Sequence, residues 1–157
     1  DTATHLELYR NFESIGVVIH THSKYATAFA QACKNIECLG TTHADHFYGS
    51  VPCVPVLDDS QIVSEYELNT GKSIIKYYNE NAICPDSMPA CIVANHGPFV
   101  WGKTVEKALY NGVLLEEIAH MNILTYDIKK ETQAIKQPLL DKHYLRKHGV
   151  NAYYGQQ

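Results

Sequence analysis

Three histidines in the first hundred residues have the spacing of a metal site. His20 and His22 lie at the end of an apolar strand predicted at residues 15–20, and His96 follows a second one predicted at residues 90–94. Residues i and i+2 of a strand point to the same face, so His20 and His22 can reach one ion. His96 can join them if the two strands are neighbours, and three imidazoles with an open position are typical of a catalytic zinc-type site. Ordinary histidines at strand ends remain the alternative.

Two other segments bring together groups that can transfer protons or bind anions. Residues 40–45 form a predicted polar loop that combines hydroxyls, an imidazole and the Asp45 carboxylate. Residues 141–149 are dense in cations, and Arg146 in this segment can bind a phosphate through two parallel hydrogen bonds. On pattern alone a satisfied polar turn is the better explanation of the first segment. An amphipathic C-terminal helix is the alternative for the second.

The elements that position these groups alternate along the chain, which predicts an α/β fold. Pro52 and Pro55 lie in an extended stretch, where proline favours an edge strand or irregular backbone. The predicted strands are residues 15–20, 36–39, 90–94 and 98–101, with the proline-containing stretch at 48–57.

Helices are predicted between these strands. Asp58 begins a polar cap for one helical segment, and we expect Thr70 and Gly71 to break it before a second helix that runs to about Asn79. Residues 104–129 form the longest predicted helix, and it is apolar around much of its circumference. We therefore expect it to be heavily buried in the domain or in a subunit interface. The other predicted helices are one that opens the chain and one at residues 24–34.

Length and composition exclude several classes of protein. The 157 residues are enough for one domain with a proper core, and we predict a single domain over residues 1–157. With 45% hydrophobic and 19% charged residues, the chain is not disordered. The net charge of −4 argues against general nucleic-acid binding, and no apolar run approaches the roughly 18–20 residues of a membrane span. Five cysteines without CxxC spacing predict reduced thiols in a cytoplasmic protein.

The charge is distributed unevenly. Residues 129–157 hold 6 of the 13 Lys and Arg residues but 2 of the 17 Asp and Glu residues. A basic tail on an acidic body favours a local anion site or a subunit contact. A solvated basic helix end is an equally good explanation.

Four segments closely resemble the 4-epimerases of the class II (fuculose-type) aldolase/epimerase superfamily, and they occur in the family's order. The resemblance covers essentially all 157 residues, and it implies a three-layer α/β/α fold with a mostly antiparallel central sheet. It also implies an isomerase that converts L-ribulose 5-phosphate to D-xylulose 5-phosphate by retro-aldol cleavage of the C3–C4 bond and re-addition. The four segments are VIHTHS (18–23), GTTHAD (40–45), HGPFVWGK (96–103) and LDKHYLRKHG (140–149).

The resemblance implies a metal and its ligands. The superfamily's zinc is held by a carboxylate and three histidines, which fall here on Asp1, His20, His22 and His96. Another divalent metal such as Mn²⁺ would suit the same nitrogen and oxygen donors.

The resemblance also implies which residues act on the substrate. The proton-transferring aspartate and tyrosine fall on Asp45 and Tyr154, and these reach the metal site from a neighbouring subunit of a C4 homotetramer. Arg146 falls on the phosphate side of the substrate. The matching substrate-binding positions are Thr41, Glu67, His143 and Arg146.

One departure from the family pattern, and the choice between epimerase and aldolase within the superfamily, leave alternatives. Family members carry roughly seventy residues before the position of Asp1, so we expect a C-terminal portion that lacks the N-terminal strands. Aldolases of the superfamily carry a glutamate at the position of Asp1, so the shorter aspartate, together with Asp45 and Tyr154, favours epimerisation over aldehyde release. The alternatives are a class II sugar-phosphate aldolase and an inactive metal-binding fragment.

Overall fold

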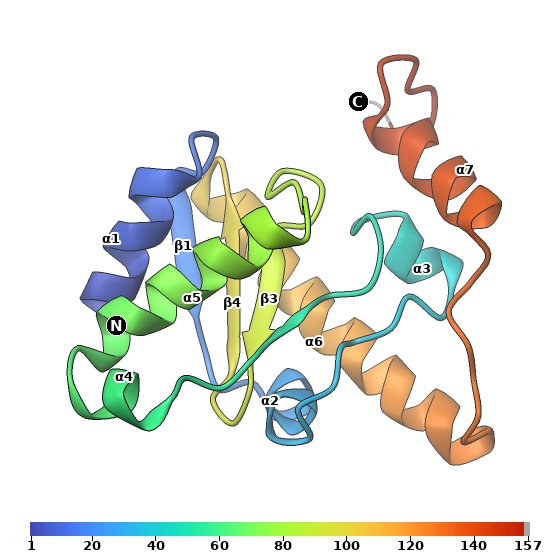
Figure 1. The fold of residues 1–157 in the computed structure, drawn as a ribbon. Coiled ribbons are helices and arrows are strands. Elements are labelled where there is room, and N and C mark those ends of the chain that lie inside the picture. Colours follow the sequence, from blue (N-terminus) through green and yellow to red (C-terminus); the bar gives the residue numbers. More distant parts are fainter. Residues whose placement is uncertain (156–157) are drawn as a thin grey trace.

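The computed structural model describes residues 1–155, in which helices alternate with short strands (Figure 1). The helices are α1 (Thr2–Asn11), α2 (Lys24–Gln31), α3 (Thr41–Ala44), α4 (Asp59–Val63), α5 (Tyr66–Glu80), α6 (Val105–Ile128) and α7 (Gln137–His148). The strands are β1 (Val17–His20), β2 (Cys53–Val54), β3 (Ala90–Val93) and β4 (Pro98–Gly102).

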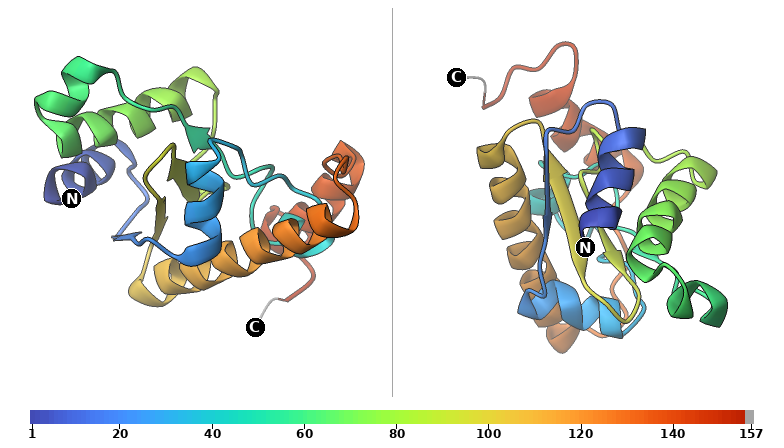
Figure 2. Two further views of the ribbon diagram at one scale, coloured as in Figure 1. Left: turned by 90° about the horizontal axis from the view of Figure 1, so that it is seen from below. Right: turned by 90° about the vertical axis from the view of Figure 1, so that its left-hand side faces the viewer.

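The four strands form one sheet in the order β1-β4-β3-β2. β4 pairs antiparallel with both β1 and β3, whereas β2 adds to β3 in parallel. Helices α1 and α5 cover one face of this sheet, and α6 with α2 beside it covers the other (Figure 2). The predicted three-layer α/β/α arrangement with a mostly antiparallel sheet is confirmed.

The core lies on both faces of β3 and β4, whose residues are all buried. Such strands must be apolar along their whole length, which explains the continuous apolar runs in the sequence. Trp101 of β4 packs against Phe12 and Tyr78, and its indole N–H donates to the Pro85 carbonyl at 2.9 Å. The polar ends of these aromatic side chains are thus satisfied inside the core.

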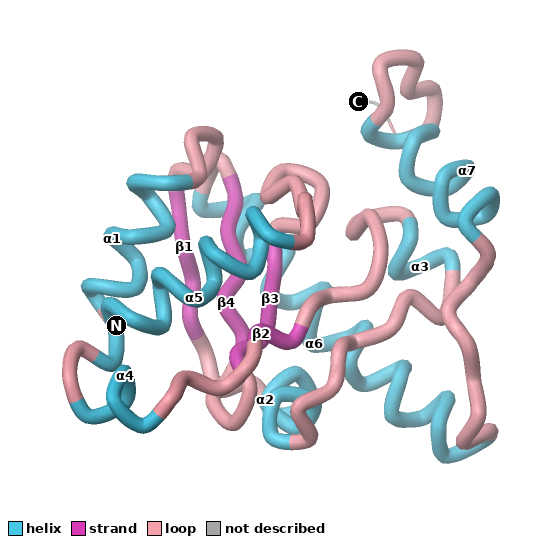
Figure 3. The backbone as a smooth tube through the Cα atoms, viewed as in Figure 1, coloured by secondary structure: helices cyan, strands magenta, loops and turns pink. Residues whose placement is uncertain are grey.

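The chain on either side of β2 is mostly irregular (Figure 3). The predicted strand at residues 36–39 is wrong, because Ile36 makes a single bridge with Val51 and no ladder follows. The Ser50 hydroxyl accepts from the backbone N–H of Cys38, so a side chain takes the place of the next strand partner. The stretch at 48–57 contributes the short edge strand β2, as its prolines predict.

The predicted helix break at Thr70 and Gly71 is also wrong. Helix α5 passes through both residues, and the Thr70 hydroxyl donates to the Tyr66 carbonyl at 2.8 Å. Glycine is needed there for packing, since a Cβ at position 71 would lie 2.7 Å from Cβ of Glu7 and 3.2 Å from Cα of Thr4. The break occurs instead between α4 and α5.

Replacing Gly71 with alanine is expected to lower the free energy of unfolding by about 1–3 kcal/mol, because α1 and α5 must move apart. Gly112→Ala is the matched control. Its new Cβ would lie 3.4 Å from Val100 Cγ2, an ordinary contact, so helix propensity should raise stability by up to about 1 kcal/mol. Urea unfolding of both variants measures these changes. Equal effects of the two substitutions would contradict the close approach at Gly71.

Helix α6 is less buried than its composition predicts. One side, which includes Leu115 and Ile118, packs under the sheet, but Val105, Leu109 and Val113 are each about 60% exposed. These three residues are spaced four apart, so they form one apolar ridge on the outer side of the helix. Among residues 1–155, no helix combines the length and the apolar character needed to cross a membrane.

Candidate functional site

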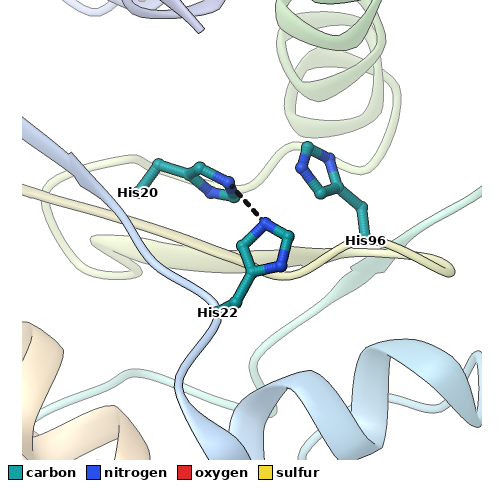
Figure 4. A group of neighbouring side chains, drawn as sticks. All are labelled: His20, His22 and His96. Atoms are coloured by element: carbon teal, nitrogen blue, oxygen red, sulfur yellow. Dashed lines mark hydrogen bonds between the residues drawn. The ribbon is translucent and has the colours of Figure 1, made fainter.

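His20, His22 and His96 come together at one end of the sheet (Figure 4). One ring nitrogen from each lies within 4.8 Å of the others, and the Nε2 atoms of His20 and His22 are 3.1 Å apart. Two nitrogens bound tetrahedrally to one zinc ion are expected to lie about 3.3 Å apart, which is close to the observed separation. The convergence predicted from the spacing of the three histidines is confirmed.

A tight turn between β3 and β4 brings His96 to the other two rings. Asn95 adopts the left-handed conformation with φ of 59°, which asparagine tolerates better than most residues. At position 97 a Cβ would lie 2.8 Å from the Thr21 carbonyl oxygen, so glycine allows the turn to lie against the loop that carries His22. The backbone of this turn therefore explains the residues on both sides of His96, which are Asn95 and Gly97.

Two of the three rings, those of His20 and His96, are in the form that binds a metal. Nδ1 of His20 lies 2.9 Å from the carbonyl oxygen of Pro98, and a carbonyl can only accept. Nδ1 therefore carries the ring proton, and Nε2 keeps its lone pair for an ion. Burial lowers the pKa of His20, and burial together with the charges of His20 and His22 lowers the pKa of His96 to about 4. Neutral imidazoles at pH 7 fit a divalent cation.

Two further predicted residues lie at the starts of α1 and α5. The Asp1 carboxylate oxygen is 3.9 Å from Nε2 of His20, and its side chain is 46% exposed. Glu67 is exposed in the first turn of α5, directly after Tyr66, whose hydroxyl is 3.3 Å from Nδ1 of His96. Asp1, the N-cap of α1, therefore borders His20, whereas the contact of Glu67 is made by its backbone carbonyl, which accepts from the Thr4 hydroxyl.

A second cluster forms around Asp45, between α3 and α7. The Asp45 carboxylate accepts from His143 Nδ1 at 2.9 Å and from Arg146 at 3.0 and 3.2 Å, and Lys147 Nζ lies 3.2 Å from it. The Arg146 guanidinium also stacks on the Tyr154 ring, with Cζ 4.2 Å from the ring centroid. One arginine therefore contacts both Asp45 and Tyr154.

The cations around Asp45 control its ionisation. Burial alone would raise the pKa of Asp45, but hydrogen bonds from His143, Lys147 and Arg146 outweigh it and hold the pKa below its ordinary value. Asp45 is therefore a carboxylate at neutral pH, with the capacity to accept a proton. Three basic side chains around one carboxylate also leave the cluster positive, which suits an anionic ligand.

The predicted polar loop at residues 40–45 is wrong in its backbone. Thr41–Ala44 form the short helix α3, and the Asp45 N–H donates to the Thr41 carbonyl at 2.9 Å. Packing of α3 against α7 stabilises this single turn. The helix places Thr41 one turn before Asp45.

The two clusters occupy different parts of the molecule. Figure 1 shows α3 and α7 to the right of the sheet, whereas β1, which ends at His20, reaches the bottom of the sheet. Within residues 1–155, no hydrogen bond or ring contact joins Asp45, His143, Arg146 or Tyr154 to the three histidines. A reaction that uses both clusters needs two chains or a large movement within one.

Sequence reasoning missed three residues. Lys147 and His148 contact Asp45, His148 through the Asp45 carbonyl at 2.9 Å. Both lie in the cation-rich segment at 141–149, so the charge density was the available signal. The sequence holds no comparable signal for Tyr66, because only the fold brings it to His96.

Stability is expected to fall between pH 6.5 and pH 4 because of His43 beneath the Asp45 cluster. Burial lowers the pKa of His43 to about 4, below the unfolded value near 6.5. The folded chain therefore resists protonation, so stability is full above pH 6.5 and is reduced by about 3 kcal/mol once the pH has fallen through 4. Urea unfolding across this range should show a smaller decrease for His43→Gln. His46, whose pKa is also lowered to about 4, keeps its share in both proteins, and an equal decrease in both would contradict the prediction.

Comparison with known proteins identifies the family. A family model described as the class II aldolase and adducin N-terminal domain matches residues 1–123. The chain belongs to the class II aldolase and adducin family. Within this family it is 49% identical over 156 residues to L-ribulose-5-phosphate 4-epimerase UlaF of Salmonella paratyphi B, which covers 99% of this chain and 68% of that protein. The resemblance stated from the four segments is confirmed.

Solved structures of the class II aldolase family have the same fold. An L-fuculose 1-phosphate aldolase matches 90% of this chain with a TM-score of 0.68 and 18% identity. YgbL from Escherichia coli matches 90% of it with a TM-score of 0.63 and 27% identity. The chain spans 59% of the aldolase and 63% of YgbL, which is less than two thirds of either.

Proposed function

We propose that this chain is part of a cytoplasmic, metal-dependent isomerase that converts L-ribulose 5-phosphate to D-xylulose 5-phosphate. The observation that carries the proposal is the 49% identity to UlaF along almost the whole chain, against 18% to the fuculose aldolase. The unpaired cysteines support a reducing compartment.

The metal in this proposal is zinc, held by His20, His22 and His96 with Asp1 as the fourth ligand. The Asp1 carboxylate lies 3.9 Å from Nε2 of His20. A modest movement of the Asp1 side chain would let both groups bind the same ion. A divalent cation bound there supplies Lewis-acid chemistry, which stabilises the negative charge that develops when the C3–C4 bond breaks. We assign contact with the substrate hydroxyls to Glu67, which directly follows Tyr66 in the first turn of α5.

Inversion at C4 needs two proton-transferring groups, and we assign them to Asp45 and Tyr154. One group takes the proton of the C4 hydroxyl as the C3–C4 bond breaks and a C4 aldehyde forms. After the aldehyde has rotated, C3 attacks its opposite face, and the other group returns a proton to the C4 oxygen. We assign substrate contacts to Thr41, His143 and Arg146, and Arg146 with the neighbouring Lys147 would anchor the phosphate during the rotation. The contacts of His143 and Arg146 with Asp45, and of Arg146 with Tyr154, support this assignment.

The separation of the two clusters supports a homotetramer with C4 symmetry, in which each site combines the histidines of one subunit with Asp45 and Tyr154 of the next. The exposed apolar ridge of Val105, Leu109 and Val113 supplies a surface suited to such contacts. Sedimentation should show a tetramer, and a stable, active monomer of the complete protein would contradict the shared site.

A coupled assay tests the proposed activity on both the complete protein and the 157-residue chain. L-ribulose 5-phosphate is the substrate, and both D-xylulose 5-phosphate and free glycolaldehyde phosphate are measured. D-xylulose 5-phosphate without aldehyde release supports the epimerase. Accumulation of the aldehyde would favour the class II aldolase, and a complete protein that binds metal without turnover would favour a non-enzymatic role.

A further inference from the structure

Tyr66 contacts Nδ1 of His96, which we call the outer ring nitrogen because the other one, Nε2, is the proposed metal-binding atom. Its hydroxyl oxygen lies 3.3 Å from Nδ1 of His96, and the two ring centroids are 5.8 Å apart. We propose that Tyr66 is a positioning residue, which holds the His96 ring so that Nε2 faces the metal. This inference rests on the metal site of the proposed function.

The position of the proton on the His96 ring explains why the Tyr66 phenol is suited to hold that ring. An imidazole that binds a cation through Nε2 keeps its proton on Nδ1, where it needs an acceptor. The Tyr66 oxygen accepts that proton in a hydrogen bond, which selects one tautomer and fixes the rotation of the His96 ring. Without it, the half-buried Nδ1–H would have no acceptor, and the ring would turn more freely.

The backbone around Tyr66 is held from two sides. The Thr70 hydroxyl donates to the Tyr66 carbonyl at 2.8 Å, and the Thr4 hydroxyl of α1 donates to the Glu67 carbonyl at 2.6 Å. The first turn of α5 is therefore tied both to its own second turn and to α1. A phenol on so firmly held a backbone can fix the orientation of the ring that it contacts.

His20 is the other histidine of the cluster whose Nδ1 has a hydrogen-bond partner, and that partner is a backbone carbonyl. Nδ1 of His20 donates to the Pro98 carbonyl, which no side-chain substitution removes. His96 is thus the member of the cluster whose outer contact can be deleted by removing one oxygen atom. Tyr66→Phe makes that deletion and keeps the ring.

Titration of the metal-free chain with Co²⁺, followed by its visible absorption, tests the inference without an activity measurement. Tyr66→Phe is expected to weaken Co²⁺ binding by about 10–100-fold and to alter the absorption bands, the usual effect of losing an outer partner of a ligand. Tyr77→Phe is the matched control. Tyr77 lies on the same helix against the core, and its hydroxyl makes no hydrogen bond to any residue that the structure describes.

Each outcome of the titration decides the role of Tyr66. Wild-type affinity in Tyr66→Phe would overturn the inference, and so would an equal loss in Tyr77→Phe. If the wild-type chain bound no Co²⁺, both this inference and the proposed metal site would be wrong. Metal binding that depends on Tyr66 in a complete protein without epimerase activity would contradict the proposed activity alone.

Discussion

Replacing His96 with asparagine is expected to lower metal affinity by more than about 100-fold, beyond the loss that an outer partner of a ligand causes. The asparagine is shorter than the histidine and offers an amide oxygen in place of the Nε2 that converges with His20 and His22. Epimerase activity should fall with the metal content. Metal analysis of the dialysed protein and the coupled assay measure the two effects together.

His120→Asn provides a matched control for that substitution. His120 stacks on Tyr25 with ring centroids 4.0 Å apart and lies outside the three-histidine cluster. Its replacement should leave metal content unchanged. If His96→Asn retained a full complement of metal, the cluster would not be the metal site.

Replacing Asp45 with asparagine is expected to reduce epimerisation by about 10²–10⁴-fold without loss of metal. The amide keeps the size of the side chain but cannot accept the substrate proton. Tyr154→Phe should likewise spare the metal, because the ring that stacks on Arg146 remains and only the hydroxyl is removed. Its effect should be concentrated on one direction of proton delivery at the C4 oxygen. Because a catalyst does not change the equilibrium between the epimers, kcat/KM measured from either epimer should fall by the same factor.

Asp141→Asn is the matched control for Asp45→Asn. It also removes one negative charge, on α7, but it leaves the proposed proton acceptor in place. Asp141 accepts hydrogen bonds from Tyr48 and Gln137, away from the Asp45 cluster, so its replacement should leave turnover nearly normal. Thermal unfolding of Asp45→Asn identifies any share of the effect that comes from leaving His143, Arg146 and Lys147 without their carboxylate partner. Near-normal turnover in a folded, complete Asp45→Asn protein would refute the assignment of Asp45 as a proton acceptor.

Local patterns in the sequence were sufficient for the convergence of the three histidines and for the buried strands. The two-residue period of a strand puts His20 and His22 on one face, and the pairing of β1 with β4 brings the turn that carries His96 beside them. The continuous apolar runs of β3 and β4 likewise reported burial on both faces. In each case the information lies within a few residues of the feature that it predicts.

The errors come from contacts between distant parts of the chain. Gly71 reads as a helix break in isolation, yet its small size is required by α1, more than sixty residues earlier. Thr41–Ala44 is too short to be stable as a free helix and depends on packing against α7. The contact between Tyr66 and His96 has the same origin, since it exists only after α5 has packed across the sheet.

The distance between the Asp45 cluster and the three histidines has a genetic consequence. If each site is assembled from two neighbouring chains, Asp45→Asn and His96→Asn damage different halves of it, and two inactive proteins can complement each other. In randomly mixed tetramers from equal amounts of both variants, about a quarter of the sites would pair an intact histidine cluster with an intact Asp45. A cell that carries one allele of each kind would then regain growth that neither allele supports alone.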